Sequence, residues 1–151
     1  MKSALTADGS SRIANRFRNR RVQAQMSDRP DEGIIRPADS VPENEVAAGK
    51  GTRVQVLVGP DEGAPNFAMR RFRMDDGGGI PAHHNDVEHE QYVLRGRARI
   101  TVGHAVHEVG PDDTLYIPAG VTHSYEVIEG PFEFLCVVPN APDEIHFDDD
   151  G

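Results

Sequence analysis

The stretch Gly77-Gly-Gly-Ile-Pro-Ala-His83-His84-Asn85-Asp86-Val87-Glu88-His89-Glu90 holds three of the seven histidines of the chain. A fourth, His123, follows about thirty residues later, after the turn-forming run Pro118-Ala-Gly-Val-Thr. Imidazole binds Zn, Cu, Fe and Ni well, and a catalytic metal needs about three protein ligands and an open position. Two neighbouring strands that each contribute imidazoles would therefore surround one ion.

On both sides of this stretch the chain has the pattern of an all-β protein. Short runs of β-branched and aromatic residues recur at roughly 8–12-residue spacing, each closed by Gly, Pro, Asp or Asn, with no helical periodicity between them. The predicted strands are 53–58, 67–74, 91–94, 97–102, 105–109, 114–117, 124–128 and 132–138. Gly103-His104 predicts a tight hairpin turn. The pattern indicates an antiparallel sandwich or barrel of about 100 residues.

Length and composition exclude several classes of protein. A chain of 151 residues favours one domain. No run approaches the ~18 apolar residues of a membrane span, which argues against an integral membrane protein. The single cysteine, Cys136, excludes an intramolecular disulfide framework and a zinc site built from several cysteines. Since no signal-peptide core is evident, we expect a cytoplasmic protein.

Charge is distributed unevenly along the chain. Residues 1–29 carry a net charge of +5 and the remainder −14, which gives −9 in total. The acidic body argues against nucleic-acid binding by the barrel. The arginine-rich segment 12–21 is interpreted as a flexible or weakly helical leader, with an arm for nucleic acid or a membrane surface as the alternative. Residues 28–50 are expected to be extended and loop-like.

Two spaced motifs resemble those of small single-domain cupins. The first motif of that family is Gly, five residues, His-x-His, three or four residues, Glu, six residues and Gly, and this frame is occupied by Gly77, His83-x-Asn85, His89 and Gly96. The second is Gly, five residues, Pro-x-Gly, two residues, His, three residues and Asn, and this frame is occupied by Asp112, Pro118-x-Gly120, His123 and Val127. The order and separation of the two motifs make the resemblance specific.

This resemblance implies a fold and an assembly. It implies a cupin double-stranded β-helix, a jelly-roll barrel, over residues 50–140. Residues 1–49 would form an N-terminal extension that is partly flexible, and residues 141–151 an acidic C-terminal tail. Because small cupins frequently dimerise, it also implies a homodimer.

The resemblance further implies one divalent transition-metal ion, of manganese, iron, nickel or zinc. Its ligands would be His83, His89 and His123. The frame departs from the family at two ligand positions, where Asn85 stands for the second His and His89 for the Glu. Some small cupins carry the run Glu-His-Glu at the second of these positions and use that histidine.

The fourth ligand is left open by the sequence. Side chains alternate along a strand, so Asn85 faces the same way as His83 and is the predicted fourth ligand. His84 would replace Asn85 if a bulge shifted the strand. Glu90 satisfies the longer spacing of the motif and would bind the ion or accept a hydrogen bond from a ligand N–H.

Similar cupins imply dioxygenase-like chemistry on a small organic acid or phenolic compound. Glu90 and Glu88 are the predicted proton acceptors. The predicted substrate contacts are Tyr92, Tyr125 and Arg97. Tyr92 could instead be part of the core and pocket wall, and Tyr125 could simply pack. Arg97 could instead lie on a solvated strand face. A metal-dependent isomerase or lyase is the rival enzyme, and a small-ligand binding or sensor module without catalysis is the rival non-enzyme.

Overall fold

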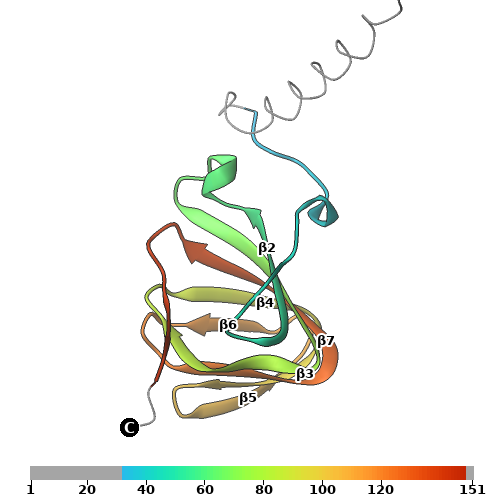
Figure 1. The fold of residues 1–151 in the computed structure, drawn as a ribbon, viewed down its shortest axis with the longest axis vertical. Helices are drawn as coiled ribbons and strands as arrows, with labels where there is room; N and C mark the ends of the chain where they lie inside the picture. The colour runs from blue at the N-terminus through green and yellow to red at the C-terminus, as the bar shows by residue number, and fades with distance from the viewer. Residues whose placement is uncertain (1–31, 149–151) are drawn as a thin grey trace, which may run out of the picture.

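The computed structural model of the protein describes residues 32–148, which are folded mainly into strands (Figure 1). The elements in chain order are η1 (Ala38–Ser40), β1 (Asn44–Glu45), β2 (Lys50–Val58), η2 (Pro60–Glu62), β3 (Phe67–Asn85), β4 (His89–Val102), β5 (Ala105–Val109), β6 (Thr114–Ile117), β7 (His123–Pro139) and β8 (Ile145–Phe147). The predicted all-β class is confirmed, as is the hairpin at Gly103-His104, which joins β4 to β5.

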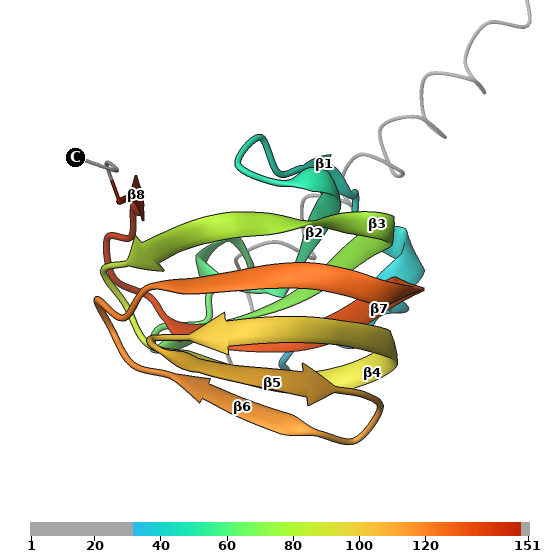
Figure 2. The same cartoon turned by 90° about the horizontal axis from the view of Figure 1, so that it is seen from below.

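Three long strands form the body of the sheet. β7 pairs antiparallel with β3 on one side and with β4 on the other. The order is β1-β2-β3-β7-β4-β5, while β6 pairs with the start of β4 and β8 with the end of β3. Figure 2 shows β3, β7 and β4 curving together around one interior, as a jelly-roll barrel requires.

The long strands bend where the sequence predicted breaks. The register between β3 and β7 shifts between Met74 and Gly79, and that between β4 and β7 shifts repeatedly over residues 93–98. Gly79 has a φ of 155°, and a Cβ there would lie 2.0 Å from the carbonyl oxygen of Tyr125. Glycine is therefore needed at position 79, where the backbones of β3 and β7 come close together. Strand β3 continues through this irregularity and does not end at Met74. In the same way, the predicted strands 91–94 and 97–102 form the single strand β4, and 124–128 and 132–138 form the single strand β7.

The core fills the space between the two halves of the curved sheet. Its largest fully buried apolar side chains are Phe132, Phe134, Met74, Ile100 and Ile117. The Phe134 ring stacks on Phe72 and on Tyr125, with centroids 5.1 Å and 5.3 Å away. Burying one such side chain contributes about 1.5–3 kcal/mol. A stack of three rings thus runs through the barrel and ends beside the histidines.

The sheet extends past both ends of the predicted barrel, 50–140. Asn44 pairs with Val54 of β2, and β8 pairs with residues 83–85 of β3. The Gln55 side chain also donates hydrogen bonds to the carbonyls of Ala38 and Val41, which fixes the preceding segment to the sheet. The leader predicted over 12–21 lies outside the described residues. Across 32–148, no helix is long and apolar enough to cross a bilayer.

Candidate metal centre

Three histidines from three different strands lie together inside the barrel. His83 of β3 and His123 of β7 are direct partners across their antiparallel pair, and their ring centroids are 4.3 Å apart. The ring of His89, at the start of β4, is 5.7 Å from that of His123. Their exposed fractions are 3%, 2% and 6% in the order His83, His123, His89. The structure therefore brings together the three imidazoles predicted as ligands.

Backbone carbonyls hold two of these rings in one orientation. Nδ1 of His83 lies 2.8 Å from the carbonyl oxygen of Pro81, and Nδ1 of His123 lies 2.9 Å from that of Val121. Because a carbonyl can only accept, Nδ1 carries the proton in both rings and Nε2 keeps its lone pair. Nε2 of His123 and Nε2 of His89 are buried without any hydrogen-bond partner. Leaving such groups unpaired costs about 1–3 kcal/mol each, so these atoms are poised for a ligand.

Burial keeps the three imidazoles neutral. Desolvation lowers the pKa of His89 to about 3 and that of His123 to about 4, and it also lowers the pKa of His83. The positive charge of Arg70 adds to the lowering at His89. At neutral pH all three rings are therefore uncharged, with one nitrogen protonated and a lone pair on the other, which is the form that binds metal ions.

Asn85 presents its carbonyl oxygen to the same interior. Its Nδ2 donates to Oδ2 of Asp143 at 3.2 Å, while its own Oδ1 is buried without a partner. Oδ1 of Asp143 accepts a second hydrogen bond from the backbone N–H of Asp86 at 2.9 Å. Since a carboxylate only accepts, Asp143 determines which end of the amide faces inward. Asn85 is buried on the same side of β3 as His83, as strand alternation predicted. Asp143 was predicted to be part of the acidic tail, and its contact with Asn85 was not foreseen.

The donor set fits a divalent transition metal. Neutral imidazoles with one amide oxygen suit manganese, iron, nickel or zinc, and two of the imidazoles and the amide present unpartnered buried atoms. The ligand nitrogens of the three rings are more than 4.8 Å apart in at least one pair. Binding one ion would therefore draw the rings together by side-chain movement.

The sequence and fold of the chain match known proteins. A family model described as Cupin domain matches residues 70–138. A solved cupin 2 domain-containing protein from Halorhodospira halophila is 30% identical, with a TM-score of 0.62 over 66% of this chain and 72% of that one. The chain belongs to the cupin superfamily.

Two further proteins are similar to this cupin. The polyketide cyclase RemF from Streptomyces resistomycificus is 27% identical, with a TM-score of 0.69 over 78% of this chain and 87% of that one. The mannose-1-phosphate guanylyltransferase ManC of Salmonella typhimurium (strain LT2) is 34% identical over 62 residues. That match covers 40% of this chain but only 13% of ManC, so it concerns a small part of the larger protein.

The two predicted proton acceptors lie on the outside of the cupin barrel. His89 points inward, so alternation along β4 turns Glu90 outward, and Glu88 just before the strand is exposed as well. Each carboxylate is therefore separated from the histidines by the sheet itself. This placement corrects the prediction that Glu90 binds the ion or that either glutamate takes a proton from a substrate beside it.

The predicted substrate contacts are divided between the two faces of the barrel. The hydroxyl of Tyr92 donates to Asp112 at 2.6 Å, and the guanidinium of Arg97 pairs with Glu108 at 2.9 Å, both on the exposed face. These two residues therefore do not reach the histidines. Tyr125 does, because its buried ring packs edge-on against His123 with centroids 5.9 Å apart.

His84 belongs to a separate surface cluster. Its Nδ1 lies 3.2 Å from Asp148, and its ring stacks on His146 at 4.9 Å. No bulge therefore brings His84 into the site in place of Asn85. Beside it, within residues 32–148, lies the only trio of His, Cys, Asp or Glu ligand atoms that all fall within 4.8 Å of one another, namely Asp86, Glu144 and His146.

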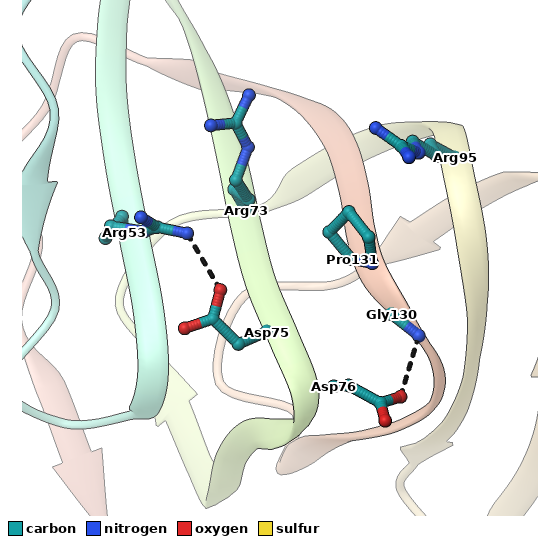
Figure 3. A pocket seen from close by; sticks show the side chains of 7 residues that line it. All are labelled: Arg53, Arg73, Asp75, Asp76, Arg95, Gly130 and Pro131. Atoms are coloured by element: carbon teal, nitrogen blue, oxygen red, sulfur yellow. Dashed lines mark hydrogen bonds and ion pairs between the residues drawn. The ribbon is translucent and has the colours of Figure 1, made fainter.

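A surface pocket of about 390 Å³ lies among residues of β2, β3, β4 and β7, and no histidine lines it (Figure 3). It is lined by Arg53, Arg73, Asp75, Asp76, Arg95, Gly130 and Pro131. Two of its arginines are paired with carboxylates, Arg53 with Asp75 at 2.8 Å and Arg73 with Glu133. These carboxylates offset most of the positive charge of the pocket.

Sequence reasoning missed an interior row of polar side chains next to the histidines. Arg70 of β3, Cys136 of β7 and Gln91 of β4 are aligned across the three strands. Nη2 of Arg70 lies 3.2 Å from Sγ of Cys136, and Nε2 of Gln91 donates to the Tyr125 hydroxyl at 2.7 Å. The alternation Ala68-x-Arg70-x-Phe72-x-Met74 was the available signal, because it places Arg70 among inward-facing residues.

Proposed function

We propose that this cupin is a metal-dependent enzyme that acts on a small organic acid or phenolic compound. The ion would be held by His83, His89 and His123, with Oδ1 of Asn85 as the fourth ligand. The observation that carries this proposal is a set of buried, neutral donors from three strands whose ligand atoms include unpartnered Nε2 and Oδ1 atoms. Buried polar atoms of folded proteins are nearly always paired, so a cluster of three unpartnered ones supports a bound ligand there.

The chain's own residues prepare the surroundings of the ion. When bound, the ion would supply Lewis-acid polarisation of a substrate oxygen. Burial raises the pKa of Tyr125, so its hydroxyl stays protonated. Its hydrogen bond with Gln91 is therefore one between two neutral groups. The aromatic stack of Tyr125, Phe134 and Phe72 supplies an apolar floor that suits a planar ring.

Two reaction classes are supported by different observations. Dioxygenase-like chemistry follows from the resemblance in the two sequence motifs and from a set of imidazoles that suits redox-active iron or manganese. Ring closure without net oxidation is the second candidate, because a similar protein that spans most of this chain is named a polyketide cyclase. The two candidates share the metal and differ in whether dioxygen is consumed.

Metal analysis of protein purified without a His tag tests the metal. His123→Ala should abolish metal binding, because His123 lies next to both other imidazoles. His104→Ala, at the exposed β4–β5 turn, is the matched control and should keep the wild-type metal content. A normal metal content in His123→Ala would refute the ligand assignment.

Oxygen consumption tests the reaction class. The metal-loaded protein would be mixed with catechols, keto acids and diketones while dioxygen is recorded, and the same panel would be followed by mass spectrometry under argon. Uptake of dioxygen with one compound would support the dioxygenase. A product of unchanged mass formed under argon would support ring closure or isomerisation, and binding without turnover would support the sensor alternative.

A further inference from the structure

Arg70 is a charged side chain that points into the barrel. It lies opposite Cys136 of β7, which is fully buried, and opposite Val56 of β2. Its guanidinium carbon lies 5.1 Å from the centroid of the Phe72 ring, which fixes the side chain by a cation–π contact. Arg70 is thus a partly buried side chain on the inner face of the sheet, held against Cys136 and Phe72.

No anionic partner for Arg70 exists among residues 32–148. None of their carboxylates lies within ion-pair distance of Arg70, and its Nε is buried with no hydrogen-bond partner. Its contact with Cys136 does not compensate the charge, because burial raises the pKa of that thiol and keeps it neutral. A partly buried arginine without an anion is unfavourable, since part of its hydration is removed and no ion pair replaces it.

The electrostatics of the site favour an anion between Arg70 and the histidines. Arg70 contacts Cys136, whose sulfur also accepts a hydrogen bond from Gln91. Gln91 in turn is hydrogen-bonded to Tyr125, whose ring packs against His123, so a continuous row of inner-face side chains joins Arg70 to the histidines. The buried polar residues of the described chain are Thr52, Gln55, His83, Asn85, His89, Gln91 and His123, and none is a carboxylate. A divalent ion on three neutral imidazoles would add two positive charges, against which Asp143, the carboxylate bound to Asn85, supplies one negative charge.

We propose that Arg70 binds the carboxylate of an anionic substrate whose other oxygen groups face the histidines. This rests on the proposed function and names its substrate class, an organic acid with a planar or aromatic body. The guanidinium matches a carboxylate through paired N–H donors, and the partly buried Phe72 would contact the apolar part. Arg97, the arginine predicted for this role, is on the outer face.

The experiment compares two probes of similar shape, one anionic and one neutral. Salicylate carries a carboxylate and salicylamide a neutral amide, and each would be titrated calorimetrically into metal-free and zinc-loaded protein. Wild type should bind salicylate more tightly. Arg70→Met keeps an unbranched apolar side chain and should weaken salicylate roughly ten- to hundredfold, leaving salicylamide unchanged. Arg99→Met, which removes an exposed arginine paired with Glu126, should change neither affinity.

Arg70→Lys is a second variant that tests the proposal even if Arg70→Met does not fold. Lysine keeps the charge but not the paired donors, so salicylate should bind with intermediate affinity. Salicylate affinity equal to wild type in the folded Arg70 variants, or no salicylate binding by wild type, would overturn the inference.

Zinc content, measured on the same samples, separates the two proposals. If Arg70→Met holds zinc and binds salicylate normally, only the role of Arg70 fails. If His123→Ala keeps full zinc, the metal site itself is misassigned, whatever Arg70 does.

Discussion

A single hydrogen bond decides which atom Asn85 offers to the metal centre. The carboxylate of Asp143 accepts from the Asn85 amide nitrogen, which leaves the amide oxygen facing the imidazoles. Pro81 and Val121 do the same for His83 and His123 through their carbonyls. In each case a group outside the ligand shell fixes the lone pair that faces inward.

Asp143→Asn should weaken metal binding. An asparagine at this position can donate as well as accept, so the Asn85 amide is free to turn its nitrogen inward. We expect the affinity for zinc to fall by about tenfold, the lower end of such effects. A competition titration against a chromophoric chelator measures it. Asp112→Asn, which alters a hydrogen bond with Tyr92 on the outer face, is the control. Equal affinities for the two variants would show that Asp143 does not orient the ligand.

At the level of elements, glycines determine whether the short predicted strands stay separate. The sequence marks Gly77 to Gly79, Gly96 and Gly130 as interruptions, whereas β3, β4 and β7 each continue through them. A local pattern cannot distinguish a strand end from a bulge, because the difference lies in the backbone of a neighbouring strand. The Tyr125 carbonyl next to Gly79 is such a neighbour.

Gly79→Ala should destabilise the barrel far more than Gly77→Ala. Both glycines have positive φ, but a Cβ at Gly79 meets the Tyr125 carbonyl oxygen at 2.0 Å, while one at Gly77 has nothing within 4 Å. We expect a loss of more than about 3 kcal/mol for Gly79→Ala and about 1 kcal/mol for Gly77→Ala. Urea unfolding followed by circular dichroism measures both. Similar losses in the two variants would contradict the steric account.

The site was predictable where it depends on strand alternation. Parity and motif spacing place His83, Asn85, His89 and His123 in the interior. The same alternation turns Glu90 outward, because it follows the inward-facing His89. Glu88 and Glu90 were predicted as proton acceptors from the chemistry of a carboxylate, without applying this alternation. Asp143 follows a chain reversal after β7 that no local pattern encodes.

For the whole molecule, burying three neutral imidazoles links stability to pH. Their folded-state pKa values lie below the ordinary value of 6.5, so below that pH the unfolded chain binds more protons than the folded one. The histidines' contribution is fully present above pH 6.5 and is lost as the pH falls toward about 4 for His123 and about 3 for His89. The predicted homodimer stays a prediction at this scale.

The metal-free protein should therefore lose stability between pH 7 and pH 5. We expect about 2 kcal/mol for each of His89 and His123 by pH 5, from their pKa values of about 3 and about 4. Urea midpoints at several pH values measure it. In His89→Gln the loss of unfolding free energy between pH 7 and pH 5 should be smaller by about 2 kcal/mol, the contribution of one histidine. In His104→Gln this loss should equal that of wild type. A wild-type midpoint independent of pH in this window would contradict the neutral, buried state of these rings.

Strand β7 has a hydrogen-bonded neighbour on each side, β3 and β4, and each of the three strands carries one of the three histidines of the metal centre. At His123 itself, the partners are His83 on one side and Val102 on the other. Peeling away an edge strand such as β5 would thus leave the ligands where they are. Opening the ladder of β3, β7 and β4 would part them, so every unfolding event that opens this ladder would also release the ion.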